Sequence, residues 1–466
     1  MASKSNKSTK KTSNNKTASK IIKSGKKMAK KNPKGFIALV IILVVLAALG
    51  VGGFFAYRYF VPSVDFKLIG KENTNVALDS TYKEKGVVAK YNGKDISNEV
   101  VISYYLGDAK QDSIKTNVVD TVYTVKYDLN YQRYTGQLER KVKIVEVESI
   151  DINFLELGND KTGDCTFIKA GDTDILIDAG SRQASATTID NFVKGYCDDG
   201  VLEYVIATHA HQDHIEGFTS TNTNPGIFDR YKIDTLIDFA KTNNEGKTLY
   251  EKYKSLRDAK IASGDIAHHY TAAECIVETN GASKVYEIAA GITMEILDQK
   301  FYREKTSDEN DYSVCALFTQ GDNNYLFTGD LEKEGEASLV ELNNLPEVEL
   351  FKGGHHGSYT ANTDTLLSVI KPKTVCICCC AGSDEYTKNK DNMFPAQVAI
   401  DRIGKYTEKV YVTTVAIEAE PKHASLNGNI NFHSDKGQDY LVTGSNNNTI
   451  LKDTDWFKSN RTWPSA

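Results

Sequence analysis

The feature that most constrains the fold is the stretch from Thr208 to His214, in which three histidines and one aspartate follow a short apolar run. The run, Leu202 to Ala207, has the composition of a β-strand, so the histidines lie on the loop that leaves a strand end. Chemistry in α/β proteins concentrates on such loops. Imidazole and carboxylate groups are ligands for zinc, iron or manganese. Four of them within six residues are hard to explain as packing, so the pattern predicts a metal site: His209, His211, Asp213 and His214.

The first 34 residues differ from the rest of the chain in charge. They contain twelve lysines, no Asp or Glu and no apolar periodicity, so we expect a disordered basic tail over residues 1–34. The whole chain carries a net charge of −6, and removing the +12 of this tail leaves −18 for residues 35–466. That balance argues against strong non-specific DNA binding, which needs Lys and Arg at the phosphates, although it is compatible with a local basic groove.

A stretch of 23 residues without a charged side chain follows, from Gly35 to Tyr57. As a helix it would be roughly 34 Å long, enough to cross a hydrocarbon core of about 30 Å. We predict one transmembrane helix over residues 35–60, with a cytoplasmic N-terminus because the lysines precede it, and an extracellular remainder. The alternative is a cleaved signal peptide, but the apolar run is longer than such peptides usually carry.

Four of the eight cysteines crowd into one run, Cys376 to Cys380. A zinc knuckle would need two Cys-x-x-Cys pairs, and that spacing is absent. The run is therefore interpreted as a buried strand in which cysteine serves as a small apolar residue.

Residues 62–148 contain short β-branched or aromatic runs separated by turn clusters, which predicts a small β-sandwich. The runs cover 87–91, 100–105, 122–127 and 141–147. This stretch resembles the bacterial immunoglobulin-like domains of cell-surface proteins. The residues that carry the resemblance are 80–86, Asp95-Ile96 and 123–127. The resemblance implies a spacer domain without chemistry of its own.

From about residue 150 strand-like and helix-like runs alternate, which predicts a layered α/β domain. Several motifs accompany the histidine loop there: Leu157-Gly158, Gly163 to Thr166, Leu176 to Gly180, Thr208 to Gly217, Asn310 to Val314, Leu326 to Asp330 and Phe351 to Ser358. In this order they resemble the metallo-β-lactamase superfamily and, within it, the ComEC-like hydrolase domains. The resemblance implies an α/β fold of the αββα sandwich type over residues 150–445, leaving 446–466 as a C-terminal tail.

The resemblance also implies a ligand set for one or two divalent ions, zinc or manganese. The implied ligands are His209 and His211 for one ion, Asp213 and His214 for a second, Asp330 as a bridge, and His355 or His356 to complete the set. A carboxylate bridge suits two cations about 3.5–4 Å apart that share a hydroxide. Asp178 would hydrogen-bond a ligand histidine and fix its tautomer.

Many family members supply a further histidine to the first ion, between the main motif and the Gly-Asp motif. Only His268 and His269 occupy that interval here, and whether either binds metal stays open. The catalytic candidates are Asp213, Lys352, His356 and Ser358. The last three could stabilise a phosphoryl oxyanion or protonate a leaving group, although the glycines beside them could equally mark a tight turn.

Taken together, the sequence predicts a membrane-anchored extracellular hydrolase that uses metal-activated water on a phosphodiester such as nucleic acid or teichoic acid. The first alternative keeps the metal site and changes the substrate, to a cell-wall phosphorylcholine or teichoic-acid ester, a lactone or a β-lactam. The second alternative is a surface binding protein without activity. The complete ligand set argues against that one, because a decayed site would tolerate the loss of Asp213 or Asp330.

Overall fold

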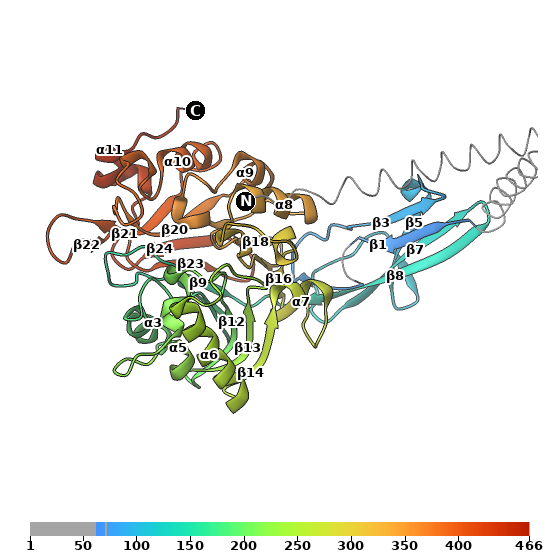
Figure 1. The fold of residues 1–466 in the computed structure, drawn as a ribbon. Coiled ribbons are helices and arrows are strands. Elements are labelled where there is room, and N and C mark those ends of the chain that lie inside the picture. Colours follow the sequence, from blue (N-terminus) through green and yellow to red (C-terminus); the bar gives the residue numbers. More distant parts are fainter. Residues whose placement is uncertain (1–61, 70–71, 466) are drawn as a thin grey trace, which may run out of the picture. The chain divides into compact units, whose positions relative to one another are not determined.

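The computed structural model describes residues 62–69 and 72–465, and the predicted basic tail and membrane helix lie outside them. Within these ranges no helix combines the length and apolar character that membrane crossing requires. The described chain forms two compact units (Figure 1). One comprises the described residues up to Thr74 with Lys83–Ile114 and Tyr123–Lys141, and the other comprises Asn75–Tyr82, Lys115–Val122 and the chain from Val142 onwards.

The strands nearest the N-terminus form two sheets. A three-stranded sheet has the order β1 (Val64–Leu68), β3 (Val87–Tyr91), β4 (Lys94–Asp95), and a five-stranded sheet has the order β2 (Asn73–Ala77), β8 (Tyr134–Val145), β7 (Val122–Tyr131), β5 (Val101–Leu106), β6 (Ala109–Gln111). Burial alternates along β7, as expected of a strand with one covered face. The predicted runs are therefore strands, while the immunoglobulin-like assignment stays a prediction.

Two eight-stranded mixed sheets make up the larger unit. The first has the order β14 (Ile266–Thr271), β13 (Lys232–Asp238), β12 (Val201–Ile206), β11 (Thr173–Ile177), β10 (Thr166–Ala170), β9 (Ile150–Phe154), β23 (Ile430–Ser434), β24 (Tyr440–Gly444). The second has the order β15 (Val285–Ala289), β16 (Ile292–Ile296), β17 (Ala316–Gln320), β18 (Asn323–Phe327), β19 (Leu350–Lys352), β20 (Thr374–Ala381), β21 (Val410–Ala416), β22 (His423–Ser425). The strands β11 to β14 are mutually parallel, as are β18 to β21.

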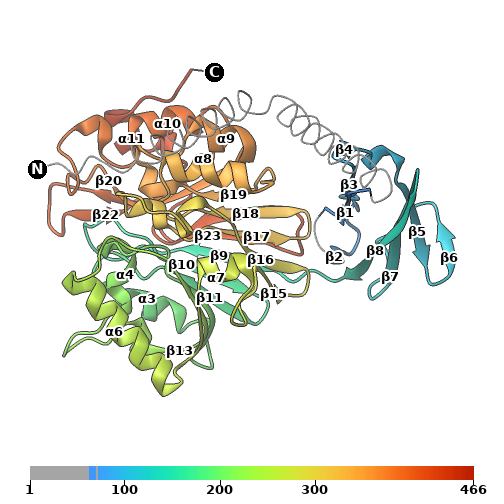
Figure 2. The same ribbon diagram turned by 45° about the vertical axis from the view of Figure 1, so that its right-hand side comes forward.

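Helices cover the outer faces of these two sheets (Figures 1 and 2). Outside the first sheet lie α3 (Ser185–Val193), α5 (Ile227–Arg230) and α6 (Thr248–Ser263), with α7 (Ala272–Val277) following β14. Outside the second lie α8 (Lys333–Leu342), α9 (Asp364–Ile370), α10 (Gln397–Ile403) and α11 (Asp455–Asn460). This is the αββα layering that the sequence predicted.

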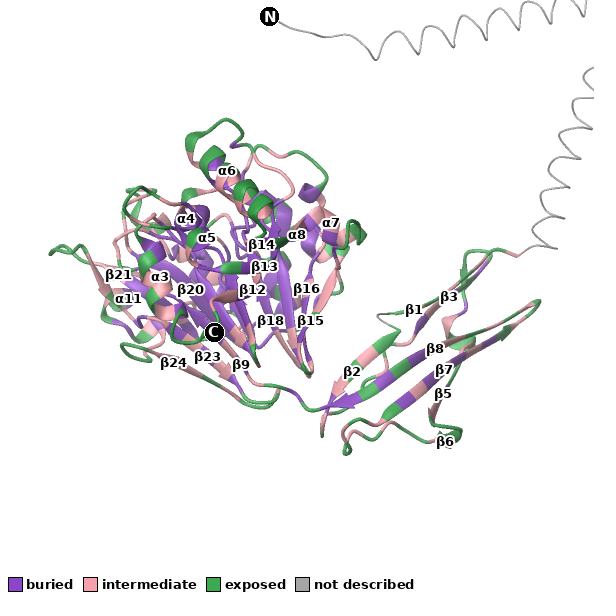
Figure 3. Cartoon of the chain, turned by 90° about the horizontal axis from the view of Figure 1, so that it is seen from below, coloured by how far each residue is buried: buried purple, intermediate pink, exposed green. Residues whose placement is uncertain are grey.

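Apolar side chains fill the space between the two sheets and the space under the outer helices. Buried residues accordingly follow the strands of both sheets, purple in Figure 3. Phe154 of the first sheet stacks on Phe327 of the second, with ring centroids 6.1 Å apart. Every residue of β20 is buried, and its cysteines divide between the layers: Cys376 and Cys378 belong to the core between the sheets, and Cys379 to the core under the helices. The predicted buried cysteine strand is confirmed.

Candidate metal centre

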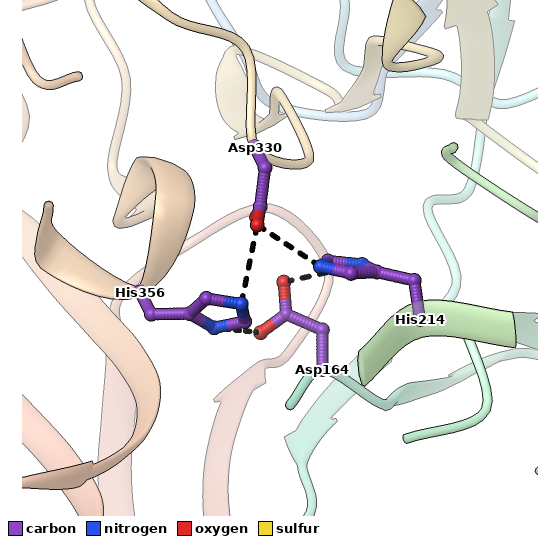
Figure 4. Close-up of side chains that lie close together, drawn as sticks. All are labelled: Asp164, His214, Asp330 and His356. Atoms are coloured by element: carbon purple, nitrogen blue, oxygen red, sulfur yellow. Dashed lines mark hydrogen bonds and ion pairs between the residues drawn. The ribbon is translucent and has the colours of Figure 1, made fainter. Parts of the chain in front are cut away.

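Four buried side chains meet where strand ends of the two sheets come together (Figure 4). We call them the inner group: Asp164, His214, Asp330 and His356. Each offers one ligand atom, and these atoms all lie within 4.8 Å of one another. Asp164 lies on the loop between β9 and β10, and His214 on the short helix α4 (Gln212–Ile215) after β12. Asp330 follows β18, and His356 lies in the turn η5 (Gly354–Gly357) after β19.

The loop after β12 is fixed by Asp178, which directly follows β11. Its Oδ2 lies 2.7 Å from His214 Nδ1 and accepts a hydrogen bond from the hydroxyl of Thr208 at 2.7 Å. Its Oδ1 accepts one from the backbone N–H of Thr208 at 2.8 Å. Gly217 completes the fit, because a Cβ there would lie 1.9 Å from the carbonyl oxygen of Ala179. His214 therefore directs its other nitrogen, Nε2, at Asp330 Oδ2, 3.0 Å away.

Two consecutive histidines adopt left-handed backbone conformations, with φ of 46° at His355 and 53° at His356. This unusual pair of conformations sends their rings in different directions. His356 is buried, with Nδ1 2.9 Å from the carbonyl oxygen of Cys378 and Nε2 3.2 Å from Asp330 Oδ2. His355 lies at the margin, with Nδ1 3.2 Å from Glu332 Oε1 and Nε2 3.9 Å from Asp330. Of the two candidates, the structure places His356 in the inner group.

Sequence reasoning missed Asp164, although it quoted the motif that contains it. The Lys352 ammonium contacts Asp164 directly and lies 3.6 Å from Asp330 Oδ1, with the lysine only 3% exposed. The predicted catalytic lysine is thus an ion-pair partner inside the cluster. A loop aspartate between two strands carries no local signal of this role, and only the folded contact with Lys352 reveals it.

Asp213, predicted as both ligand and catalytic residue, borders the inner group. Its Oδ2 lies 3.3 Å from His356 Nε2 and accepts a hydrogen bond from the Tyr386 hydroxyl at 2.7 Å. Ser358 lies further out: its hydroxyl is 2.9 Å from that of Thr360, and its backbone N–H donates to the carbonyl of His355. These contacts of Ser358 are those of a turn residue.

We call His209 and His211 the outer pair. His209 Nε2 lies 3.0 Å from His211 Nδ1, and His209 Nδ1 faces the hydroxyls of Thr208 and Ser313 at 3.2 and 3.4 Å. Burial and then the charge of His214 lower the pKa of His209 well below its usual range, so its ring is neutral. The optional ligands His268 and His269 lie on β14, where His269 pairs with Asp238 at 3.0 Å.

The carboxylates and the basic side chains of the inner group shift one another's pKa values. Burial by itself would lower the pKa of His214 and His356, but Asp330 and the other neighbouring carboxylates together outweigh it and raise both pKa values well above the ordinary range. Burial would likewise raise the pKa of Asp330, yet the two histidines hold it well below its usual value. The pKa of Asp164 is also lowered, because Lys352, His356 and His214 together overcome the effect of burial.

The donor set fits a divalent cation. Both carboxylate oxygens of Asp164, Oδ1 of Asp330 and Nε2 of His356 are buried and have ion-pair contacts, but no hydrogen bond, among the described residues. Buried polar atoms usually form hydrogen bonds, so four atoms in one cluster that have only ion-pair contacts indicate a place for a common partner such as a cation. Two imidazoles and two carboxylates are a ligand set that zinc and manganese accept.

Comparison with known proteins agrees with this geometry. Residues 158–219 match the family model of the metallo-beta-lactamase superfamily. The chain is 26% identical over 184 residues to ComE operon protein 3 of Bacillus subtilis (strain 168), covering 38% of this chain and 20% of that protein. It is 30% identical over 111 residues to Recombination protein 2 of Haemophilus influenzae, covering 24% and 13%.

Among solved structures, a metallo-beta-lactamase HARLDQ-motif mutant from Cronobacter sakazakii is 15% identical, covering 43% of this chain and 75% of that one, with a TM-score of 0.25. The chain spans a fifth or less of the two curated relatives. The match to the metallo-beta-lactamase superfamily model and the distant similarity to these two proteins confirm the resemblance found in the sequence.

Proposed function

We propose that this protein is a membrane-anchored, extracellular, metal-dependent phosphodiesterase that acts on nucleic acid. The observation that carries the proposal is the inner group, whose four buried ligand atoms all lie within 4.8 Å of one another. The apolar stretch from Gly35 to Tyr57 and the lysines before it support the anchored, extracellular placement. One of the similar proteins is named a recombination protein, and recombination acts on nucleic acid, which favours that substrate class here.

A divalent ion in this position supplies a water of lowered pKa and polarises a phosphoryl oxygen. The chain's own residues have separate tasks around it. Asp164, His214, Asp330 and His356 would hold the ion, and Asp178 fixes the orientation of the His214 ring through its 2.7 Å contact with Nδ1. Lys352 adds a fixed positive charge that balances Asp164 and favours an anionic phosphate nearby.

Hydrolysis of bis(p-nitrophenyl) phosphate by the full chain in detergent, with zinc or manganese added, tests the proposal. We expect metal-dependent turnover that falls at least about 100-fold in His214→Ala, because the metal contributes several kcal/mol to the transition state. The matched control is His433→Ala, a histidine of β23 that pairs with Asp151 and is 41% exposed. Metal bound without turnover would contradict a phosphodiesterase and direct attention to lactones, β-lactams and a binding role.

A further inference from the structure

Tyr386 connects the solvent-exposed surface with the buried site. It lies on the segment of residues 382–396 between β20 and α10, and its hydroxyl donates to Asp213 Oδ2 at 2.7 Å. The residue is nevertheless 54% exposed. One edge of the side chain is thus fixed at the metal centre, while part of the ring remains open to solvent.

Phe394, at the other end of the same segment, is partly buried against the core and lies beside Tyr386. Its ring centroid lies 5.6 Å from that of Tyr386 and 5.7 Å from those of both His355 and His356. The two aromatic rings therefore adjoin the histidines of the centre, on the side where Asp213 receives the tyrosine hydroxyl. A substrate group bound there would lie next to the reacting phosphate.

The segment is held in place at several points. The Gly382 N–H donates to the carbonyl of Phe394 at 2.8 Å, which closes its base. Glu385 accepts from Arg182 at 2.6 Å and from the backbone N–H of Thr162 at 3.0 Å. Arg461 donates to the carbonyl oxygens of residues 390 and 393, both at 2.8 Å. A surface fixed before binding loses little conformational entropy when a ligand arrives.

We propose that Tyr386 and Phe394 form a stacking surface for the base beside the scissile phosphate of single-stranded nucleic acid. The inference rests on the proposed phosphodiesterase function. An exposed aromatic ring binds unpaired bases of any sequence, since every base has a flat face and in single strands that face is available. A polyol-phosphate chain such as teichoic acid offers no flat aromatic group, so this surface favours nucleic acid over a cell-wall phosphodiester.

The test compares two substrates of the metal-loaded full chain: a short oligothymidylate, and an oligomer of equal length built from tetrahydrofuran abasic units. Both have the same phosphodiester linkage, and only the first has bases. The readout is the ratio of kcat/KM for the first to kcat/KM for the second. This ratio cancels any general damage to the metal centre that follows from losing the Tyr386 contact with Asp213.

We expect the ratio to fall about 5- to 150-fold in Tyr386→Ala, the effect of losing one base–aromatic stack. Tyr386→Phe keeps the ring and should keep the ratio within about threefold, even if kcat falls for both substrates. Tyr196→Ala, which removes a tyrosine of comparable exposure next to α3, serves as the matched control and should leave the ratio unchanged.

Each other outcome overturns a defined part of the proposal. If the wild type cleaves both oligomers and Tyr386→Ala leaves the ratio unchanged, the stacking surface is wrong and the phosphodiesterase stands. If the wild type prefers the duplex of the same oligothymidylate with its complement, recognition of a single strand is wrong. If it cleaves neither oligomer although metal is bound, the proposed function itself fails.

Discussion

The inner group and the outer pair both take histidines from the same loop after β12, but they differ in their carboxylates. His214 and His356 face Asp330 across 3.0 and 3.2 Å. Within the described ranges, neither ring of the outer pair is hydrogen-bonded to a carboxylate. Because a divalent cation is attracted first by anionic ligands, we expect the inner group to bind the tighter ion. Histidine motifs alone would not distinguish the two sites.

The largest expected effect concerns the buried ion pair of the inner group. Asp164→Asn leaves the ammonium of Lys352 without its main partner, which should destabilise the metal-free protein by about 3–5 kcal/mol. Urea unfolding in EDTA measures the loss. The double change Asp164→Asn with Lys352→Met removes both charges and should recover most of it. Equal destabilisation by the single and double variants would contradict the ion-pair account.

Activity gives the next prediction. Asp330→Asn removes the carboxylate that faces both buried histidines, so we expect loss of the inner ion and at least about a 100-fold fall in hydrolysis. Metal content by mass spectrometry, measured beside turnover, separates loss of the ion from misfolding. Retention of a full complement of metal in this variant would show that the inner group is not the main site.

The local part of this centre could be predicted from the sequence, whereas the part made by long-range packing could not. Apolar runs with histidines at their ends are local features. The strand predicted at 87–91 is found as β3, and the one predicted at 202–207 lies within one residue of β12. The choice between His355 and His356 depends on two left-handed residues in succession, which no composition signals.

Asp164 and Tyr386 illustrate the other limit. Asp164 lies in a quoted motif that gives it no ligand role, Tyr386 lies in no motif, and each reaches the site only because distant strands pack together. The same holds for β23, which joins the first sheet beside β9 although most of the domain separates them in sequence. The ligands of the histidine motif are therefore predictable, while groups that reach the site from other loops and strands require the fold.

A smaller effect on metal binding is expected from Asp178, which contacts the ligand His214 and lies outside the inner group. Asp178→Asn keeps the shape of the side chain but removes the anion that faces His214 Nδ1. Changes to such partners typically lower metal affinity about 10- to 100-fold. Competition with a fluorescent zinc chelator measures this change. Thr208→Val removes only a neutral partner of Asp178 and serves as the control. We expect it to lower the affinity for the inner ion less than Asp178→Asn does.

The smallest effect should follow from changing the outer pair. His211→Ala removes a ligand that has no carboxylate partner, so we expect the tighter ion to change its affinity by less than about tenfold, below the range for the carboxylate partner of a ligand. If two ions bind the wild type, the variant should lose the weaker one, as isothermal titration with zinc would show. Loss of the tighter ion in this variant would break the distinction between the two sites.

The cysteine strand β20 has a consequence for how the protein can be observed. All eight cysteines are free and buried, and burial raises the thiol pKa of those on this strand, so each is both unreachable and uncharged. Alkylating reagents attack the exposed thiolate. Their rate of reaction in the folded protein therefore reports the frequency of opening. The carbonyl oxygen of Cys378 contacts His356, so the rate of modification at Cys378 would report how often the structure around the metal centre opens.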